Sequence, residues 1–280
     1  MDDGSTDDTD ALMAEYMAKD ARFQYHHRPK DRLPGGNAAR NYGFEISKGD
    51  YIQWFDSDDL MHAKYISLRM CNIEEKYDLL IVNGQRLNFN KEKVRNNSFK
   101  NKNNLYTDFI LKNIEILTPS IMFKRELLLD FDLFKEDMLR SQEVEFFSRF
   151  LFEKQNLNCL LIEKIGYFYT SNPDSKSVKD KIYISNLKKD HLSVHQENWI
   201  RAKKTANHKV QGYCSKKIIE LLFSSISNSD KSLYLNIYSF AYCNLIWFKN
   251  FKFNLILWFF KKLPIIRYRA KKNLIKILSK

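Results

Sequence analysis

Helical segments alternate with short apolar segments through the first half of this 280-residue chain. The spacing of apolar residues predicts helices over 7–19, 37–47 and 62–76, and short strands over 22–27, 51–55 and 78–83. Such alternation favours an α/β fold with a largely parallel sheet and right-handed crossovers. In these sheets ligands bind at the carboxyl ends of the strands. The strand at 51–55 runs directly into Asp56, Asp58 and Asp59, so a binding site is expected there.

The second half of the chain changes character near residue 170. Residues 85–104 are polar and are expected to form a hairpin or a mobile loop. Further helices are predicted over 105–113 and 141–154, and further strands over 118–123, 157–163 and 166–170. After a loop at 171–177 the pattern is helical to the end. We therefore expect two domains, residues 1–170 and a helical C-terminal region of residues 171–280.

The composition is that of a globular protein. Hydrophobic residues make up 44% of the chain, and 21 Phe and 15 Tyr exclude disorder as its main state. The four cysteines lie too far apart for a Cys-x-x-Cys metal site or a dense disulfide framework, and they are expected to be reduced. No secretory signal is visible, so a cytoplasmic location is expected.

The net charge of +12 is distributed unevenly. Residues 201–280 hold 17 Lys and Arg against 2 acids, whereas residues 1–200 hold 29 against 32. Lysines interrupt an aromatic run over 247–262, which suits a helix lying on an anionic membrane surface. An ordinary helical subdomain with solvated lysines is the alternative. No nucleic-acid-binding module accompanies the basic tail, so nucleic acid is not expected as a partner.

Four blocks, in this order, resemble the family 2 glycosyltransferases of GT-A fold. They are residues 2–7 (DDGSTD), 36–43 (GNAARNYG), 49–59 (GDYIQWFDSDD) and 140–149 (RSQEVEFFSR). The resemblance covers about residues 1–165. It implies transfer of a sugar from a nucleotide-diphosphate-sugar donor to an acceptor, usually with inversion. Members normally carry an apolar strand and a helix before the first block, so the chain is expected to lack the first strand-helix-strand segment of a GT-A domain.

The acids after the strand at 51–55 suit a diphosphate donor, because a hard cation held by carboxylates neutralises the charge on the leaving group. Asp58 is the expected ligand of Mn²⁺ or Mg²⁺, and Asp56 is expected at the ribose or at the metal. An acidic turn that caps the next helix is the alternative. The resemblance also implies that Asp2 and Asp3 contact the nucleoside; a frayed N-terminal cap is the other interpretation.

Two further residues are candidates for binding and catalysis. Arg40 follows a Gly-Gly turn and is expected to bind the nucleotide or its phosphates, the alternative being a surface ion pair worth under about 1 kcal/mol. By resemblance, Glu143 at a helix start is the base that deprotonates the acceptor hydroxyl, and the helix dipole should keep its pKa low unless burial offsets it. Glu145 is expected to position a loop, and Gln142 stands where many members have an acid.

The leading hypothesis is a metal-dependent, inverting glycosyltransferase that acts in bacterial surface polysaccharide synthesis. It would move a single sugar, because residues 196–199 (QENW) differ from the Gln-x-x-Arg-Trp motif of processive synthases. The acceptor is expected to be a saccharide or lipid-linked, and the enzyme peripheral on the inner face of the membrane. The rival hypothesis is a non-catalytic remnant that retains part of the fold, and a nucleotidyltransferase comes third.

Overall fold

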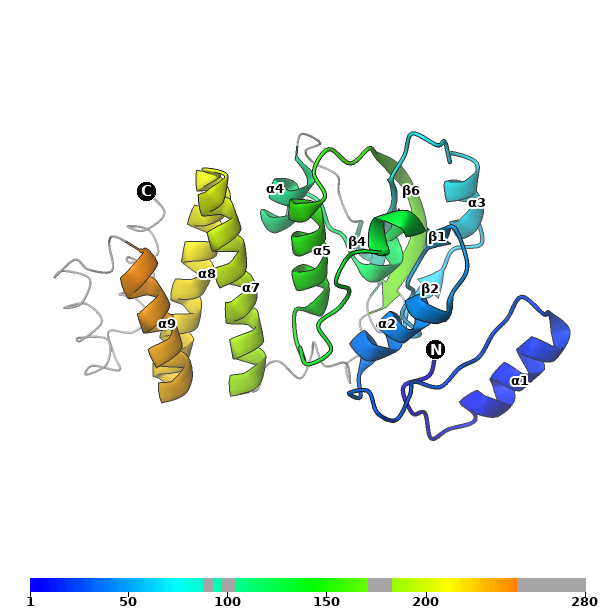
Figure 1. The fold of residues 1–280 in the computed structure, drawn as a ribbon, viewed down its shortest axis with the longest axis horizontal. Helices are drawn as coiled ribbons and strands as arrows, with labels where there is room; N and C mark the ends of the chain where they lie inside the picture. Colours follow the sequence, from blue (N-terminus) through cyan, green and yellow to red (C-terminus); the bar gives the residue numbers. More distant parts are fainter. Residues whose placement is uncertain (88–92, 97–103, 171–182, 246–280) are drawn as a thin grey trace. The chain divides into compact units, whose positions relative to one another are not determined.

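The computed structural model describes residues 1–87, 93–96, 104–170 and 183–245 (Figure 1). The chain divides into two compact units, Met1–Ser175 and Lys176–Lys280, and each is considered by itself. The expected boundary at residue 170 adjoins residues 171–182, which lie outside the described residues, so its position stays a prediction. The aromatic and basic run at 247–262 also lies outside them.

The first unit contains most of the elements expected from the sequence, with altered bounds. Its α-helices are α1 (Thr9–Lys19), α2 (Gly36–Ile46), α3 (Tyr65–Met70), α4 (Leu105–Ile110) and α5 (Gln142–Glu153). Its strands are β1 (Tyr51–Ile52), β2 (Leu60–Met61), β3 (Leu79–Leu87), β4 (Lys93–Asn96), β5 (Ile121–Lys124) and β6 (Cys159–Thr170). Two short 3₁₀ helices, η1 (Thr118–Ser120) and η2 (Arg125–Leu128), flank β5.

Several segments differ from the sequence-based predictions. Residues 118–120, expected as the start of a strand over 118–123, form η1 instead. The strand expected at 22–27 is reduced to a single parallel bridge between Asp2 and His27. Residues 53–55 continue past β1 without strand pairing, and the two strands expected at 157–163 and 166–170 are one strand, β6. A β-strand is defined by its partner, and no local pattern encodes whether a partner is present.

The prediction of a largely parallel sheet is wrong for the described sheet. The strand order is β1-β5-β3-β6-β2, with β4 added on β3. Only β3 and β6 run parallel among these strands, and every other pairing is antiparallel. The hydrophobic pattern locates strands but does not specify the direction in which distant strands meet, and the β3–β4 hairpin is antiparallel by its short connection. The fold is therefore α/β with a mixed sheet.

An aromatic cluster joins the sheet to α5. The Trp54 ring lies edge-on to Phe123, Phe134 and Phe146, with ring centroids 5.7, 5.2 and 5.6 Å away. Edge-to-face pairs of this kind add to the stabilisation from burial alone. The indole Nε1 donates a 3.1 Å hydrogen bond to the Arg40 carbonyl oxygen. The cluster thereby fixes the segment that leads to Asp56 against α2.

The parallel β3–β6 pair depends on a close approach at a glycine. Gly84 is in register with Tyr167, whose side chain is fully buried. A Cβ atom at residue 84 would lie 2.2 Å from the Tyr167 ring. Tyr167 also packs in a cluster with Tyr65, Val82 and Ile162, so the ring has little room to move.

We predict that Gly84→Ala lowers the free energy of unfolding by about 2–3 kcal/mol, because the added methyl group overpacks the strand pair. Urea unfolding of the full chain measures the effect. Gly212→Ala is the matched control. Gly212 lies within a helix and a Cβ there would meet nothing within 4 Å, so this change should stabilise by about 0.5–1 kcal/mol. Equal stability of Gly84→Ala and the wild type would contradict the packing assigned to Tyr167.

The second unit is helical over the described residues, as expected. It contains α7 (Ser185–Lys204), α8 (His208–Ser227) and α9 (Lys231–Asn244). Trp199 of α7 donates a 3.0 Å hydrogen bond to the Ser215 hydroxyl of α8 and packs against Phe240 of α9 at 5.7 Å. Neither these helices nor any other in the described ranges has both the length and the apolar character needed to cross a membrane.

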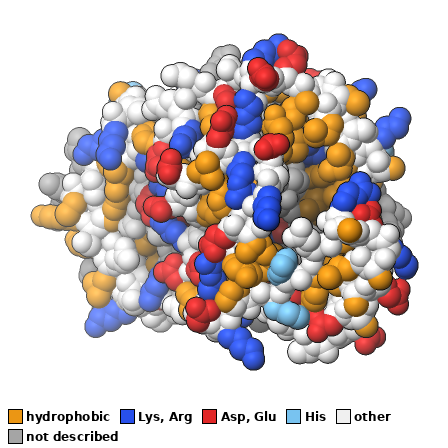
Figure 2. Space-filling view, turned by 45° about the vertical axis from the view of Figure 1, so that its right-hand side comes forward, with side chains coloured by type: hydrophobic (Ala, Val, Ile, Leu, Met, Phe, Trp, Pro, Cys, Tyr) orange, Lys and Arg blue, Asp and Glu red, His pale blue; other side chains and the backbone are white. Residues whose placement is uncertain are grey.

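Surface charge is mixed on the face that Figure 2 shows. Lys and Arg side chains alternate there with Asp and Glu across the described residues, with apolar side chains between them. Ion pairs such as Arg32–Glu45 and Lys217–Glu220 bring opposite charges together among the described residues.

Candidate active site

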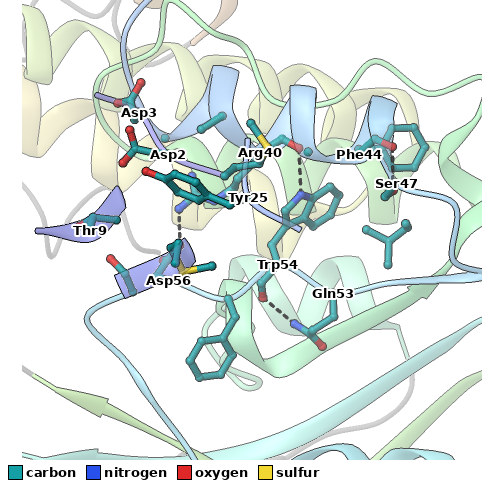
Figure 3. Close-up of a pocket in the computed structure, with 18 of the residues that line it drawn as sticks. Asp2, Asp3, Thr9, Tyr25, Arg40, Phe44, Ser47, Gln53, Trp54 and Asp56 are labelled. Carbon is teal, nitrogen blue, oxygen red and sulfur yellow. Dashed lines mark hydrogen bonds and ion pairs between the residues drawn. The ribbon is translucent and has the colours of Figure 1, made fainter. Parts of the chain in front are cut away.

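A cavity of about 880 Å³ opens beside α2, and the four residues proposed for nucleotide binding all line it. They are Asp2, Asp3, Arg40 and Asp56. Figure 3 shows these side chains arriving from three parts of the chain, namely the N-terminal segment, α2 and the segment after β1. The fold thus brings together residues that are far apart in the sequence. Asp58 and Glu143 do not line this cavity.

The Asp2 carboxylate shapes the first loop. It accepts hydrogen bonds from the Gly4 and Ser5 backbone N–H groups and from the Ser5 hydroxyl, and it lies 3.2 Å from His27 Nδ1. These bonds, that from the Ser5 hydroxyl first, hold the pKa of the Asp2 carboxyl well below its ordinary value. The Asp2 carboxylate thus holds the backbone of Gly4 and Ser5 in place beside the cavity. Its contact with a nucleoside stays a prediction.

Asp3 ties the first loop to the start of α2. Its Oδ1 accepts hydrogen bonds from Arg28 Nε and, at 3.0 Å, from the Gly35 backbone N–H. Gly35 precedes α2 and has a φ of 136°, in the region that favours glycine. Asp3 therefore holds the glycine turn that leads to Arg40.

Arg40 and Asp56 form an ion pair within the cavity (Figure 3). Arg40 Nη2 lies 2.6 Å from Asp56 Oδ1, and the two side chains are 19% and 35% exposed. The guanidinium also lies over the Phe134 ring at 5.3 Å. Because the pair is partly buried and packed on an aromatic ring, it differs from the surface ion pair that was the alternative. Arg40 Nη1 has only a long, 3.4 Å contact with Asn37 and faces Gly36.

The acids after Asp56 differ sharply in burial. Asp58 is exposed, whereas Asp59 is 7% exposed and neither of its carboxylate oxygens has a hydrogen-bond partner. Burial, with Asp58 and Asp56 nearby, raises the pKa of Asp59 to about 7. No role was predicted for Asp59 from the sequence. The one available signal was its place as the third acid of the run after an apolar strand.

These carboxylates suit a divalent cation in one respect. Within the described residues, no group of three or more His, Cys, Asp and Glu side chains is arranged to hold a metal by itself. A cation that takes most of its ligands from water and phosphate needs only one or two carboxylates. Exposed Asp58 provides one, and a bound cation would favour the ionised form of the neighbouring Asp59 carboxyl.

Glu143 lies at the start of α5 and is held by η1. Its Oε1 accepts hydrogen bonds from the Thr118 backbone N–H, at 2.5 Å, and from the Thr118 hydroxyl. Burial raises the pKa of Glu143 despite these bonds; the charge of Asp56 raises it further, and Arg40 lowers it. Burial therefore outweighs the helix dipole.

Glu145 faces away from Glu143 and holds a loop, as expected. It is 1% exposed and pairs with Arg149 Nε at 2.7 Å and with Lys135 Nζ at 3.2 Å. Arg149 in turn donates to the carbonyl oxygens of Asp132 and Leu133. Burial tends to raise the pKa of Glu145, but the Arg149 and Lys135 contacts lower it below its ordinary value.

We predict that Glu145→Gln lowers the free energy of unfolding by about 2–3 kcal/mol at pH 7, because it leaves the buried Arg149 without its counter-charge. The folded pKa of Glu145 lies below the unfolded value, so its contribution is present at neutral pH and is lost as pH falls below about 4. The difference from the wild type should therefore narrow in acid. Urea unfolding at pH 7 and pH 3.5 tests this, with the largely exposed Glu126→Gln as control. A difference that does not change with pH would contradict it.

Comparison with known proteins identifies the family of the N-terminal part of the chain. Residues 1–135 match the model of glycosyl transferase family 2. This part of the chain belongs to that family. The match contains the blocks at 2–7, 36–43 and 49–59 and ends before α5, so it is shorter than the expected extent of about 165 residues and does not include Glu143.

Curated relatives match shorter segments. An uncharacterized glycosyltransferase of Rickettsia bellii is 39% identical over 75 residues, which are 27% of this chain and 10% of that protein. Glycosyltransferase GlyG of Streptococcus pneumoniae is 32% identical over 91 residues, which are 32% of this chain and 29% of that protein. The chain therefore matches less than a third of the length of these relatives.

A solved structure resembles nearly the whole chain. The crystal structure of S. aureus TarS 1–349 in complex with UDP-GlcNAc aligns with a TM-score of 0.63 and 17% sequence identity, and the alignment covers 99% of this chain and 80% of that chain. This likeness confirms the expected GT-A fold, with a helical C-terminal region after it.

Proposed function

We propose that the protein is an inverting glycosyltransferase that moves a single sugar from a nucleotide-diphosphate-sugar donor to a saccharide or lipid-linked acceptor. The observation that carries the proposal is the cavity that holds Asp2, Asp3, Arg40 and Asp56 together, with Glu143 electrostatically coupled to two of them. The membership of residues 1–135 in glycosyl transferase family 2 supports it. So does the likeness to TarS, which was crystallised with UDP-GlcNAc and with UDP.

Arg40 is suited to the diphosphate of the donor. One side of its guanidinium pairs with Asp56, and Nη1 has only the long contact with Asn37, so N–H donors remain for phosphate oxygens. Phe134 beneath the guanidinium restricts its motion, which reduces the entropy lost on binding. Asp2 and Asp3 also line the cavity, and we place the nucleoside beside them.

We propose that Asp58, with Asp56 nearby, holds Mn²⁺ or Mg²⁺ against the donor. A bound cation would neutralise charge on the leaving diphosphate. Asp58 is exposed and has no ion pair or hydrogen bond within the described residues, so it is available as a ligand. Asp56 is already paired with Arg40 and serves the site more through that pair.

Asp58→Asn should leave the fold unchanged and abolish Mn²⁺-dependent binding of UDP, because an amide does not provide the anionic oxygen that a hard cation prefers. Isothermal calorimetry with UDP, with and without Mn²⁺, measures this. Asp20→Asn is a control, since Asp20 lies in an exposed ion pair with Arg22 and outside the cavity lining. Metal-dependent binding that survives Asp58→Asn would remove Asp58 from the site.

We propose that Glu143 is the base. The acceptor hydroxyl oxygen forms a bond with the anomeric carbon while the bond from that carbon to the diphosphate oxygen breaks. The hydroxyl proton passes to the Glu143 carboxylate, and the nucleoside diphosphate leaves with the bonding electrons. The raised pKa of Glu143 makes it a stronger base than an exposed carboxylate, provided that it is ionised at the working pH.

Glu143→Gln should lower kcat by about 10² to 10⁴ and leave the affinity for UDP nearly unchanged, because the group acts in the transition state. The assay follows UDP release from UDP-GlcNAc and other UDP-sugars with candidate acceptors. Glu153→Gln, at the far end of the same helix, is the matched control. Unchanged kcat in Glu143→Gln would refute the assignment. UDP binding without transfer of any sugar by the wild type would favour the non-catalytic remnant.

The proposal also concerns the acceptor and contact with a membrane. The 17 basic residues against 2 acids after residue 200, together with the aromatic run at 247–262, suit an anionic membrane surface and hence a lipid-linked acceptor of bacterial surface polysaccharide synthesis. On this proposal the enzyme works from the cytoplasmic side, on the inner face of the membrane.

A further inference from the structure

The 3₁₀ helix η1 is a buried junction of the first unit. All three of its residues, Thr118, Pro119 and Ser120, are buried. The Ser120 hydroxyl donates to the Leu117 carbonyl oxygen at 2.6 Å and accepts from the Leu117 N–H at 2.9 Å, so the turn is closed on itself. Polar groups that remain in such a buried turn need partners from elsewhere in the fold.

Arg69 and Tyr65 of α3 satisfy two of these groups. Arg69 Nη2 donates to the Pro119 and Ser120 carbonyl oxygens at 3.0 Å each, and the Tyr65 hydroxyl donates to the Pro119 carbonyl oxygen at 2.7 Å. Arg69 is 0% exposed and has no carboxylate partner within the described residues. Desolvating a buried guanidinium is costly, and its hydrogen bonds to the carbonyl oxygens of η1 offset part of that cost. The same bonds restrict the movement of η1.

Gln53 connects the same turn to the cavity. Its Nε2 donates to the Thr118 carbonyl oxygen at 2.9 Å and to the Trp54 carbonyl oxygen at 2.7 Å. Trp54 lies two residues before Asp56, so the turn is tied to the segment that carries the Arg40–Asp56 ion pair. The η1 turn therefore has a fixed position relative to the proposed donor site.

The remaining polar groups of Thr118 point at Glu143. Both its backbone N–H and its hydroxyl donate to the same carboxylate oxygen, Oε1. Within the described residues, no hydrogen bond or ion pair reaches Oε2. One oxygen is anchored, and the other is left to accept a proton.

We propose that Thr118 is a positioning residue for the base: its two donors fix the Glu143 carboxylate so that Oε2 faces the acceptor hydroxyl. This inference rests on the proposed role of Glu143 and extends it to a residue that touches neither donor nor acceptor. The buried bonds from Arg69, Tyr65 and Gln53 make the anchor rigid. A carboxylate held in one orientation favours proton transfer, because no conformational entropy is lost in orienting it during each turnover.

The hydroxyl bond also affects the ionisation of Glu143. Burial and Asp56 raise the pKa of Glu143, while the Thr118 hydroxyl, the Thr118 N–H and Arg40 lower it. Asp59, Tyr167 and Tyr169 are coupled to Glu143 as well. Removing the hydroxyl leaves the backbone N–H bond and these other groups in place. The pKa of Glu143 should then rise, and less of the base is ionised at a given pH.

The experiment compares Thr118→Val, which removes the hydroxyl and keeps the shape, with Thr118→Ser, which keeps the hydroxyl. The Glu143 carboxyl is observed by NMR in protein labelled with ¹³C at glutamate side chains, and its signal is assigned by its loss in Glu143→Gln. Thr118→Val should raise the titration midpoint of Glu143 by about 0.5–1 pH unit, and Thr118→Ser should leave it near that of the wild type. Thr205→Val is the control, since the Thr205 hydroxyl bonds only to α7 carbonyl oxygens in the second unit.

Kinetics supply the second measurement. Thr118→Val should lower kcat about tenfold, leave KM for the UDP-sugar unchanged and move the acidic limb of the pH–rate profile upward, with Thr118→Ser near the wild type. If Thr118→Val does not fold, Thr118→Ala removes the same hydroxyl. A Glu143 midpoint that is unchanged without the hydroxyl would overturn the proposal, whether or not sugar is transferred. A shifted midpoint in a protein that transfers no sugar would leave the anchor in place and refute only the proposed function.

Discussion

The position of Trp54 is the constraint on which the proposed site depends. Its ring is enclosed by Phe123, Phe134 and Phe146, from β5, the loop before α5 and α5 itself. Its indole N–H is bonded to the Arg40 carbonyl oxygen. A single buried side chain thus sets where α2 lies relative to the segment after β1, and the Arg40–Asp56 ion pair forms as a consequence. Close-packed aromatic side chains have few alternative arrangements. The backbone that carries Arg40 and Asp56 is therefore held as rigidly as the core.

Hydrogen bonds to buried polar groups are a second constraint on the site, after the packing of Trp54. The η1 turn carries carbonyl oxygens and N–H groups that water does not reach, and the fold satisfies them with Arg69, Tyr65, Gln53 and Glu143. Unsatisfied groups of this kind would be costly, so each bond restricts the turn. Some buried side-chain atoms among the described residues still have no hydrogen-bond partner, including Gln53 Oε1, Arg69 Nε and both carboxylate oxygens of Asp59. Asp59 is the acid among them that adjoins the proposed site. It lies directly after Asp58, which is the position where we place a cation.

The comparison with TarS shows that two chains with few identical residues share this fold. At 17% identity the two chains share one fold over 99% of this chain. The family-model match is confined to residues 1–135, and this segment contains all the residues that line the cavity. The α5 helix, which carries the proposed base Glu143, lies beyond the match. The proposed donor residues therefore lie within the segment that matches the family, whereas the proposed base lies outside it, and the link between Thr118 and that base is found only from their contact.

The sequence by itself determined which segments form helices, that an apolar strand leads into Asp56, and which loops carry the candidate donor residues. These features are local. Apolar periodicity, glycine turns and acids directly after a strand can be recognised without knowing the tertiary contacts of those residues. The tertiary structure alone decided the mixed direction of the sheet, because strand pairing joins residues such as Tyr51 and Lys124 that no local pattern relates. It also decided which acid is buried, that Asp56 pairs with Arg40, and that Glu143 is anchored by Thr118. Burial and partner choice depend on what the rest of the chain places around a side chain, and these two quantities set the charge and the freedom of every group in the site.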